Sequence, residues 1–237
     1  MKKQTYLVFL VILSCIQFVF GQQEGVITYE ITVNNHRTIP ADREGMKAMI
    51  PQYRTFKQQL FFKANESIYK PLIEEEDEEN NDRGRRFRMN AINYTDASAL
   101  LYLTQTTVFG KKYLISDTLK TDPWKFGKGT KNILGHECMQ AYYTTTVDER
   151  QQSITAWYAP DLPPNLGPEK YNTLPGAVLA VDVNNAERVI VARKIELRIL
   201  GKNETVRMPA DGQKITGEEF KKIMKEQRNQ RMGRFKN

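Results

Sequence analysis

The sequence predicts a mainly β protein whose antiparallel sheet curls into a barrel or half-barrel, with one short early helix and a C-terminal basic helix. Two observations lead to this fold class. About ten short segments are rich in β-branched and aromatic residues, and turn-forming residues separate them at hairpin spacing. Helix signals occur only near the two ends, so the strand–helix alternation of a parallel-sheet fold is absent. Strands at this spacing are typical of barrels and curled sheets.

The N-terminus has the features of an export signal. Lys2 and Lys3 precede an apolar run over residues 6–20, which is shorter than a bilayer-spanning helix needs. Gly21 supplies a small residue at a signal-peptidase site, so we expect residues 1–21 to be a signal peptide that is cleaved after Gly21. A retained N-terminal anchor is the alternative. Both imply an exported protein, periplasmic or associated with the outer membrane.

The two cysteines leave further alternatives open. Residues 12–15 loosely resemble a lipobox, so lipidation at Cys15 competes with simple cleavage. If the leader is cleaved, Cys138 is the only cysteine that remains, and no intramolecular disulfide can form. Cys138 is then either a small buried hydrophobic residue or a free thiol.

The positive net charge lies at the ends of the chain. The whole sequence carries a formal charge of +7. Lys2 and Lys3 leave with the leader, and residues 214–237 hold eight basic and three acidic side chains, so residues 22–213 are close to neutral. Together with the export signal, this distribution argues against a nucleic-acid-binding protein.

Residues 22–213 are expected to form a single antiparallel β domain. We expect a short helix over residues 39–50, because Pro40 is tolerated in a first helical turn. Gly127 and Gly129 are expected in a turn region. The expected strands cover residues 25–33, 56–62, 66–72, 86–94, 99–107, 112–116, 131–134, 137–147, 152–158, 176–183 and 188–200.

A strongly acidic block interrupts this strand pattern at residues 74–82, and four arginines follow it closely. Such a block repels itself, so we expect residues 74–86 to form a charged, flexible loop. A calcium site or an interaction segment is the alternative, but the ligand spacing of an EF-hand is absent.

Residues 214–237 are expected to form a basic amphipathic helical tail. Thr216 and Glu219 have the spacing of a capping box, which begins a helix that continues to about Gln230. Its narrow apolar face consists of Phe220, Ile223 and Met224. The tail is therefore a solvated extension, a helix that docks on a partner, or a weak and salt-sensitive contact to a membrane surface.

A connection rich in glycine and proline leads into the strand that begins at residue 176. Pro175-Gly176 predicts a type II turn, in which proline fixes φ at the second position and glycine supplies a positive φ at the third. The residues that we expect to matter here are Gly167, Pro168, Leu174, Pro175, Gly176 and Trp157. We expect these residues to fix how the last strands enter the sheet, so their expected role is primarily structural.

A set of characteristic residues, which occur in a fixed order along the chain, extends over about residues 24–200. The stretch Thr173-Leu174-Pro175-Gly176-Ala177-Val178 is preceded by Gly167, Pro168 and Tyr171. Further landmarks are Ser67, Ile68, Tyr69, Trp124, Lys131, Ile133, Gly135, Cys138, Ala141, Ala156, Trp157 and Tyr158. This set resembles the GLPGLI family of exported Bacteroidetes proteins, although Thr173 departs from the first glycine of the motif. The resemblance implies a β-rich envelope protein without an established enzymatic activity, with outer-membrane transporters as partners of some members.

His136 and Cys138 are the candidates for site chemistry. Residues i and i+2 of a strand share a face, so the pair could bind a soft metal together. A structural zinc site needs four ligands, however, and the other histidine, His36, is far away in sequence. A buried structural cysteine beside a surface histidine is therefore favoured. A cysteine hydrolase is a further alternative, but His136 is poorly placed to act as a base for its near neighbour.

Three functions follow from these observations. The main one is a non-enzymatic binding or accessory module of the cell envelope, whose partner is an outer-membrane transporter or another envelope protein. The second is a carrier of an apolar ligand or lipid, which needs a cleft lined by the apolar strand faces. The third is an enzyme that uses Cys138. No motif for catalysis or cofactor binding occurs, and we expect no cofactor.

Overall fold

The computed structural model describes residues 23–39, 41–72, 91–147 and 150–234. The expected signal peptide (1–21) and charged loop (74–86) lie outside the described residues. Within the described ranges, no helix has the length and apolar character needed to cross a bilayer. The elements are β1 (Glu24–Asn34), α2 (Asn35–Thr38), η1 (Ala41–Met49), β2 (Tyr53–Lys63), β3 (Glu66–Pro71), β4 (Ile92–Asp96), β5 (Leu101–Val108), β6 (Lys111–Thr118), β7 (Lys125–Ile133), β8 (His136–Val147), β9 (Arg150–Ala159), β10 (Ala177–Val183), β11 (Arg188–Leu197), β12 (Gln213–Thr216) and α5 (Gly217–Arg234).

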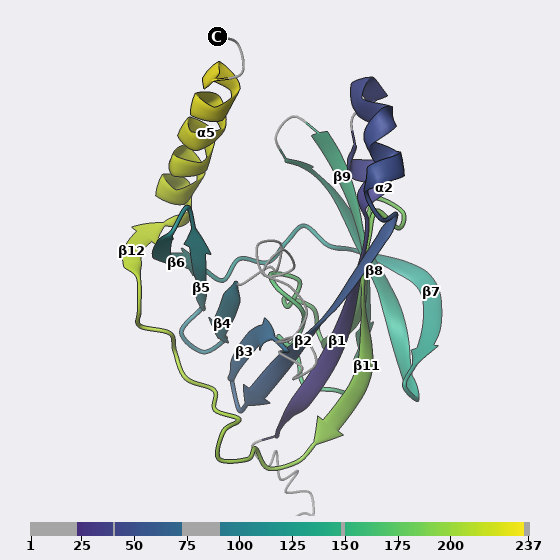
Figure 1. Cartoon of the computed structure of the whole chain (residues 1–237). Helices are drawn as coiled ribbons and strands as arrows, with labels where there is room; N and C mark the ends of the chain where they lie inside the picture. Colours follow the sequence, from purple (N-terminus) through teal and green to yellow (C-terminus); the bar gives the residue numbers. More distant parts are fainter. Residues whose placement is uncertain (1–22, 40, 73–90, 148–149, 235–237) are drawn as a thin grey trace, which may run out of the picture.

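One twelve-stranded sheet forms the body of the described part of the chain (Figure 1). Its strand order is β12-β6-β5-β4-β3-β2-β1-β11-β10-β9-β8-β7, and neighbouring strands are antiparallel except for β12 and β6. The two ends of this order do not pair with each other, so the sheet curls without closing. The expected mainly β fold is confirmed, and the half-barrel is its correct form.

The early helical region differs from the expectation of one helix. The chain forms α2 directly after β1 and then the 3₁₀ segment η1, which a kink at Arg43 interrupts. The side chains of Asn35 and His36 bond to the carbonyl oxygens of Pro51 and Ile50, at 2.9 and 2.8 Å. These contacts join the two ends of the connection, so it acts as a long turn between β1 and β2.

The expectation of a turn at Gly127 and Gly129 is wrong, because both residues lie inside β7. A Cβ at Gly127 would lie 3.0 Å from Cδ of Gln140, and one at Gly129 would lie 3.2 Å from the Trp157 ring. Pairing between β7 and β8 shifts register between residues 126 and 130. The glycines therefore allow close side-chain approach at a bulge and do not reverse the chain.

The concave side of the sheet holds the main core. Tyr29 of β1 and Tyr69 of β3 meet edge to face there, with their ring centroids 5.8 Å apart. The strand residues of this cluster come from both halves of the sheet and include Ile27, Ile31, Leu60, Phe62, Ile154, Val181 and Ile190. Residues that lie between β9 and β10 complete the cluster, so a connecting segment contributes to the core as much as strands do.

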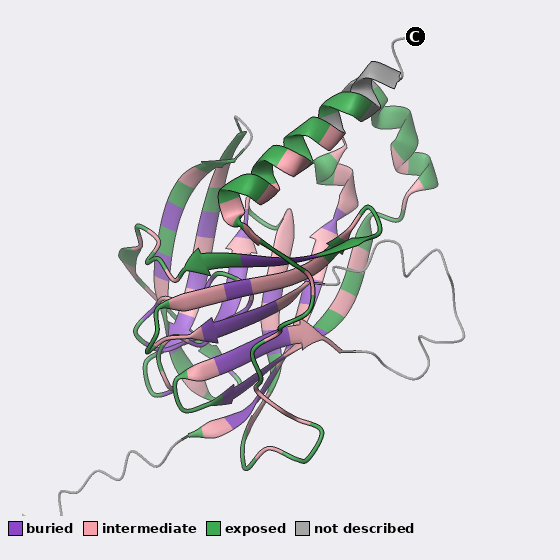
Figure 2. Ribbon diagram, turned by 90° about the vertical axis from the view of Figure 1, so that its left-hand side faces the viewer, coloured by how far each residue is buried: buried purple, intermediate pink, exposed green. Residues whose placement is uncertain are grey.

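The chain that joins β11 to β12 crosses the convex side of the sheet over β1–β6 (Figure 2). Leu200 and Val206 of this connection pack against a small cluster formed by Val26, Phe61 and Ile68. Val206 also packs against a cluster formed by Tyr94, Leu103 and Leu114. Both faces of β3–β5 are therefore protected from water, which explains why these strands are apolar on their outer face as well.

The C-terminal helix begins as expected, but a strand precedes it. Residues 213–216 form β12, which pairs in parallel with residues 113–116 of β6, so the helical tail starts at Gly217 and not at residue 214. Thr216 Oγ1 accepts the backbone N–H of Glu219 at 3.2 Å, and Glu219 Oε2 accepts the N–H of Thr216 at 2.7 Å. This is the predicted capping box. Phe220 anchors the helix by packing edge to face on Tyr113.

Candidate functional site

Several of the sequence landmarks, among them Gly167, Tyr171 and Gly176, lie in one segment, residues 160–176, which we call the motif segment. It leaves β9, crosses the concave side of the sheet and enters β10 (Figure 1). Its large apolar side chains are almost completely buried in the main core: Leu162, Leu166, Tyr171 and Leu174 are each at most 6% exposed. The motif segment therefore fills the space that an apolar ligand of a carrier would need.

Backbone hydrogen bonds hold the motif segment in place. The N–H of Val178 in β10 donates to the Leu166 carbonyl oxygen at 2.8 Å, and the N–H of Tyr171 donates to that of Pro168 at 3.0 Å. The hydroxyl of Tyr29, fully buried in β1, donates to the Val178 carbonyl oxygen at 2.7 Å. Burial without a nearby charge raises the pKa of Tyr29, so this hydroxyl keeps its proton as a donor.

Gly176 is required for a reason other than the expected turn. Its φ is not positive, so the predicted type II turn is wrong. A Cβ at Gly176 would lie 2.7 Å from the Ala159 carbonyl carbon and 2.9 Å from Cα of Pro160. Gly167 has the same role, because a Cβ there would lie 3.0 Å from the Tyr171 carbonyl carbon. Both glycines allow two backbone segments to touch.

Thr173, which departs from the motif that the sequence resembles, has a hydrogen-bond partner. The indole N–H of Trp124 donates to Thr173 Oγ1 at 3.3 Å. The Trp124 ring also packs edge to face on Tyr143 of β8, with centroids 4.6 Å apart. The threonine therefore links the motif segment to the residues before β7, a contact that neither position reveals alone in the sequence.

A buried ion pair joins the motif segment to β11. Arg188 Nη1 donates to Glu169 Oε2 at 2.8 Å, and both side chains are less than one fifth exposed. Glu169 adopts a left-handed backbone conformation (φ 53°), which is uncommon for a residue with a side chain. Burial, and then the Glu169 carboxylate, raise the pKa of Tyr171 to about 12. The same two causes raise the pKa of Tyr69 well above its usual range.

The part of the interior that faces β3–β5 is polar. Asn172 Nδ2 donates to Thr95 Oγ1 at 2.9 Å, and Thr104 Oγ1 donates to Asn93 Oδ1 at 3.0 Å. Asn172 and Thr95 are at most 3% exposed. Asn172 Oδ1 and the Tyr69 hydroxyl are buried without a hydrogen-bond partner among the described residues. Sequence reasoning missed this polar interior, because its members come from β3, β4, β5 and the motif segment, which lie far apart in sequence.

The structure separates the roles of His136 and Cys138. His136 Nδ1 bonds to Asp161 Oδ2 at 2.6 Å, which ties the start of β8 to the motif segment. Cys138 is fully buried, and its thiol donates to the His136 carbonyl oxygen at 3.6 Å. Burial, reinforced by the Asp161 carboxylate, raises the pKa of Cys138 to about 11. Among the described residues, no group of three or more His, Cys, Asp or Glu side chains could hold a metal ion.

Two further landmarks have local structural roles. Gly135 (φ 90°) forms the tight turn between β7 and β8 together with Leu134, whose φ is also positive. Trp157 is half-buried in β9, and Lys131 Nζ of β7 lies 5.9 Å from its ring centroid. Both residues therefore position the β7–β8 hairpin at the end of the sheet.

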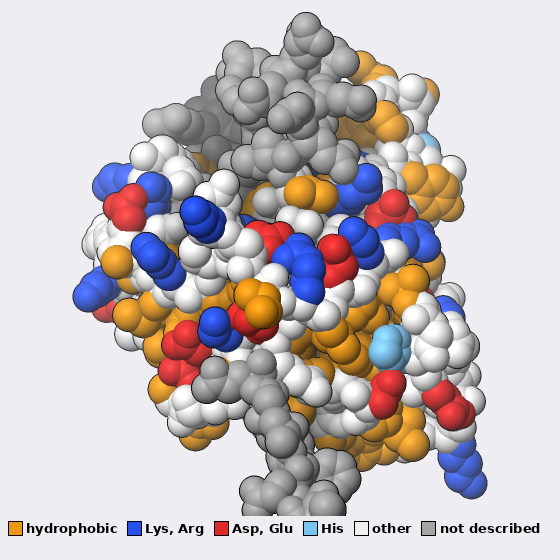
Figure 3. Space-filling view, turned by 90° about the horizontal axis from the view of Figure 1, so that it is seen from below, with side chains coloured by type: hydrophobic (Ala, Val, Ile, Leu, Met, Phe, Trp, Pro, Cys, Tyr) orange, Lys and Arg blue, Asp and Glu red, His pale blue; other side chains and the backbone are white. Residues whose placement is uncertain are grey.

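An open hollow of about 510 Å³ lies at the end of the half-barrel where β1 begins. The first half of the motif segment forms one wall, and the turns after β2 and β4 form the other. Its lining consists of Gln23, Ala64, Asn65, Ala97, Pro160, Asp161, Leu162, Pro163, Pro164, Asn165 and Leu166. Figure 3 shows this end of the molecule, where apolar side chains lie among charged ones.

Comparison with known proteins found a family model that matches a short stretch of the chain, and solved structures that share the fold. Residues 148–180 match a family described as a protein of unknown function (Porph_ging), an uncharacterised family associated with Bacteroidetes. Among the described residues, this stretch covers β9, the motif segment and the start of β10. A comparison with curated proteins found no match.

Two solved structures share the fold. They are PNGF-II in two crystal forms, in space groups P21 and C2. Each aligns with a TM-score of 0.57 at 16% identity and covers 85% of this chain. The aligned part is 33% and 32% of those chains, so this chain spans about a third of the length of PNGF-II. At this identity the likeness concerns the fold alone.

Proposed function

We propose that this protein is an exported cell-envelope protein of the GLPGLI type that serves as a non-enzymatic binding or accessory module. The observation that carries the proposal is the occupied interior. The motif segment fills the concave side with buried leucines and a tyrosine, and polar groups line the remainder. Binding would therefore use the outer surface, with an outer-membrane transporter or another envelope protein as partner.

Two further features support a module over a carrier. An apolar ligand inside the half-barrel would have to displace the motif segment and face the Glu169–Arg188 ion pair, which costs free energy. In PNGF-II the same fold makes up about a third of a longer chain, as is typical of a module.

The basic helix α5 projects from the sheet (Figure 1) and offers a second, weaker contact to an anionic membrane surface.

The enzymatic alternative rests on Cys138 and is disfavoured by its surroundings. A nucleophilic cysteine needs an exposed thiolate, whereas this thiol is fully buried and its pKa is raised. The imidazole that lies nearest in the sequence, that of His136, bonds to Asp161.

The test begins with residues 22–237, purified from the envelope fraction and extracted with organic solvent for mass spectrometry. The proposal predicts no stoichiometric lipid in the extract. It also predicts that crosslinking in intact envelopes joins the protein to a specific membrane partner. A lipid present at one molecule per chain would overturn the proposal in favour of the carrier.

A further inference from the structure

The strand β7 ends the sheet, and no strand of the described residues pairs with its outer edge. In the strand order β7 has β8 as its one neighbour. Eight of the nine positions from 125 to 133 are exposed or half-exposed, and β7 pairs regularly with β8 at both of its ends. A free edge presents unpaired N–H and C=O groups, which can pair with another extended chain.

An apolar cluster lies beside this edge. Phe126 of β7 packs edge to face on Tyr158, with ring centroids 6.1 Å apart, and the Tyr158 hydroxyl lies 3.6 Å from the sulfur of Met139. Tyr158 is buried, but Phe126 is 61% exposed and Met139 is 46% exposed. Apolar surface of this kind is stabilised when a partner removes it from water.

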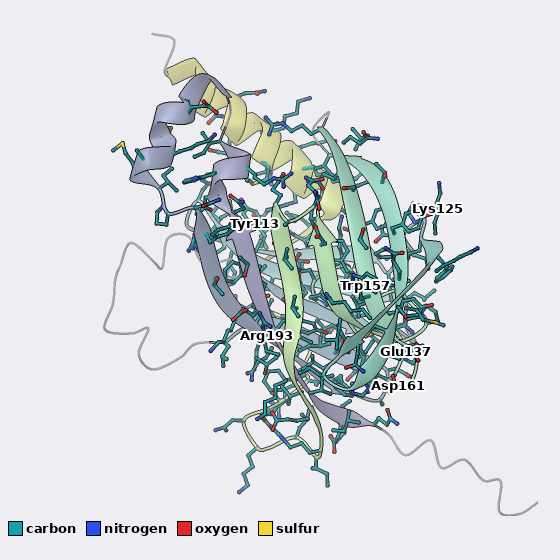
Figure 4. All side chains as sticks on the ribbon, turned by 90° about the vertical axis from the view of Figure 1, so that its right-hand side faces the viewer. Tyr113, Lys125, Glu137, Trp157, Asp161 and Arg193 are labelled. Atoms are coloured by element: carbon teal, nitrogen blue, oxygen red, sulfur yellow. The ribbon has the colours of Figure 1, made fainter. Side chains whose placement is uncertain are left out.

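The positive charge of β7 favours an acidic partner. Lys125, Lys128 and Lys131 are all exposed, and no acidic residue lies between positions 125 and 133. Figure 4 shows Lys125 at the margin of the molecule, on the side formed by β7 and β8. A second copy that paired through its own β7 would place lysines against lysines, which destabilises a sheet.

We propose that the free edge of β7 binds an extended acidic segment of a partner protein, which adds a strand to the sheet. Glutamates or aspartates of the segment would meet the three lysines, and its apolar side chains would cover Phe126 and Met139. The inference rests on the proposed role as a binding module and names the surface and the partner class.

The experiment uses isotope-labelled residues 22–237 and a capped nonapeptide of alternating glutamate and valine. Amide chemical shifts are followed during titration at low and at high salt. We expect saturable shifts concentrated on β7 and β8, and an affinity that falls about tenfold when salt screens the lysines. A peptide with lysine in place of glutamate should leave these amides unchanged.

Variants separate the edge from general electrostatics. Lys125→Glu with Lys128→Glu should weaken binding of the acidic peptide by at least about tenfold. The matched control, Lys120→Glu with Lys202→Glu, makes the same change in net charge at exposed positions outside the edge and should bind like the parent.

Two outcomes would overturn the inference. One is a set of shifts that is absent or centred on α5. The other is self-association of Lys125→Thr with Lys128→Thr without peptide binding by the parent, which would show that the lysines only protect the edge. Neither outcome would place a lipid in the interior, so the proposed function is tested separately.

Discussion

Gly176 lies where no side chain fits. Its Cα faces the backbone of Ala159 and Pro160 at the point where the motif segment meets the end of β9. Gly176→Ala should therefore force two backbone segments apart and lower the free energy of unfolding by about 3 kcal/mol, and valine should cost more. The measurement is the urea midpoint at constant slope.

Gly45 provides the matched control for this substitution. It lies in η1, and a Cβ there would have no neighbour within 4 Å. Gly45→Ala should change the stability by less than about 0.5 kcal/mol. If Gly176→Ala proves equally neutral, close backbone approach is not the reason for this glycine.

Cys138 should be inert in the folded protein. Its pKa is raised to about 11 by burial and by Asp161, so at pH 7–8 the thiolate fraction is very small. Alkylation of folded residues 22–237 should be slow and should accelerate sharply in denaturant. Alkylation of the native protein at the rate of a free thiol would support the alternative of an enzyme that uses Cys138.

At the residue scale, the sequence drew attention to Gly176 but did not show which contacts constrain it. Leu174-Pro175-Gly176 predicts a local turn, because turn signals depend on neighbouring residues alone. The actual constraint on Gly176 comes from Ala159 and Pro160, sixteen or more residues away in sequence. A local sequence pattern cannot show a contact between residues that lie so far apart in the sequence.

At the scale of elements, the motif segment is fastened to β11 by the Glu169–Arg188 ion pair. Arg188→Met would leave a carboxylate buried without its main partner, so we expect a loss of about 3 kcal/mol of stability. The double variant Glu169→Leu with Arg188→Met removes both charges and should recover part of this loss. A double-mutant cycle by chemical denaturation measures both effects, and additive losses would show that the pair is not coupled.

The capping box of α5 makes its helicity sensitive to acid. Hydrogen bonds from the backbone and hydroxyl of Thr216 lower the pKa of Glu219 below its usual 4.5. A lowered pKa means that this contribution is present above pH 4.5 and is lost as the pH falls through the lowered value. Amide signals of residues 217–222 should therefore shift toward coil in acid. Glu219→Gln should remove this pH dependence, and a dependence that persists in the variant would assign it to another group.

Local signals explain which elements were predictable. Alternating apolar residues placed β1, and the capping box placed α5, because both patterns are complete within a few residues. β12 was missed, since Gln213–Thr216 is a strand only through its pairing with β6 nearly a hundred residues earlier. The glycines of β7 were assigned to a turn because their packing against Gln140 and Trp157 cannot be read from the sequence.

For the whole molecule, the central result is that the motif segment, a connection of the chain itself, fills the concave side of the half-barrel. The curled antiparallel sheet followed from strand spacing, but the contents of its concave side did not. A connection rich in proline and glycine is usually expected on the surface. Here Leu162, Leu166, Tyr171 and Leu174 enter the core, while Asn172 and Glu169 bond to polar groups of the wall.

Hydrogen exchange of the amides of Tyr171 and Val178 tests this result most directly. Both N–H groups donate to carbonyl oxygens of the motif segment. If the segment is a permanent part of the core, the two amides should exchange only through global unfolding, with the same free energy as that of Val181 in β10. Rapid exchange at Tyr171 and Val178 while Val181 stays protected would show that the segment leaves the interior, and would contradict the account.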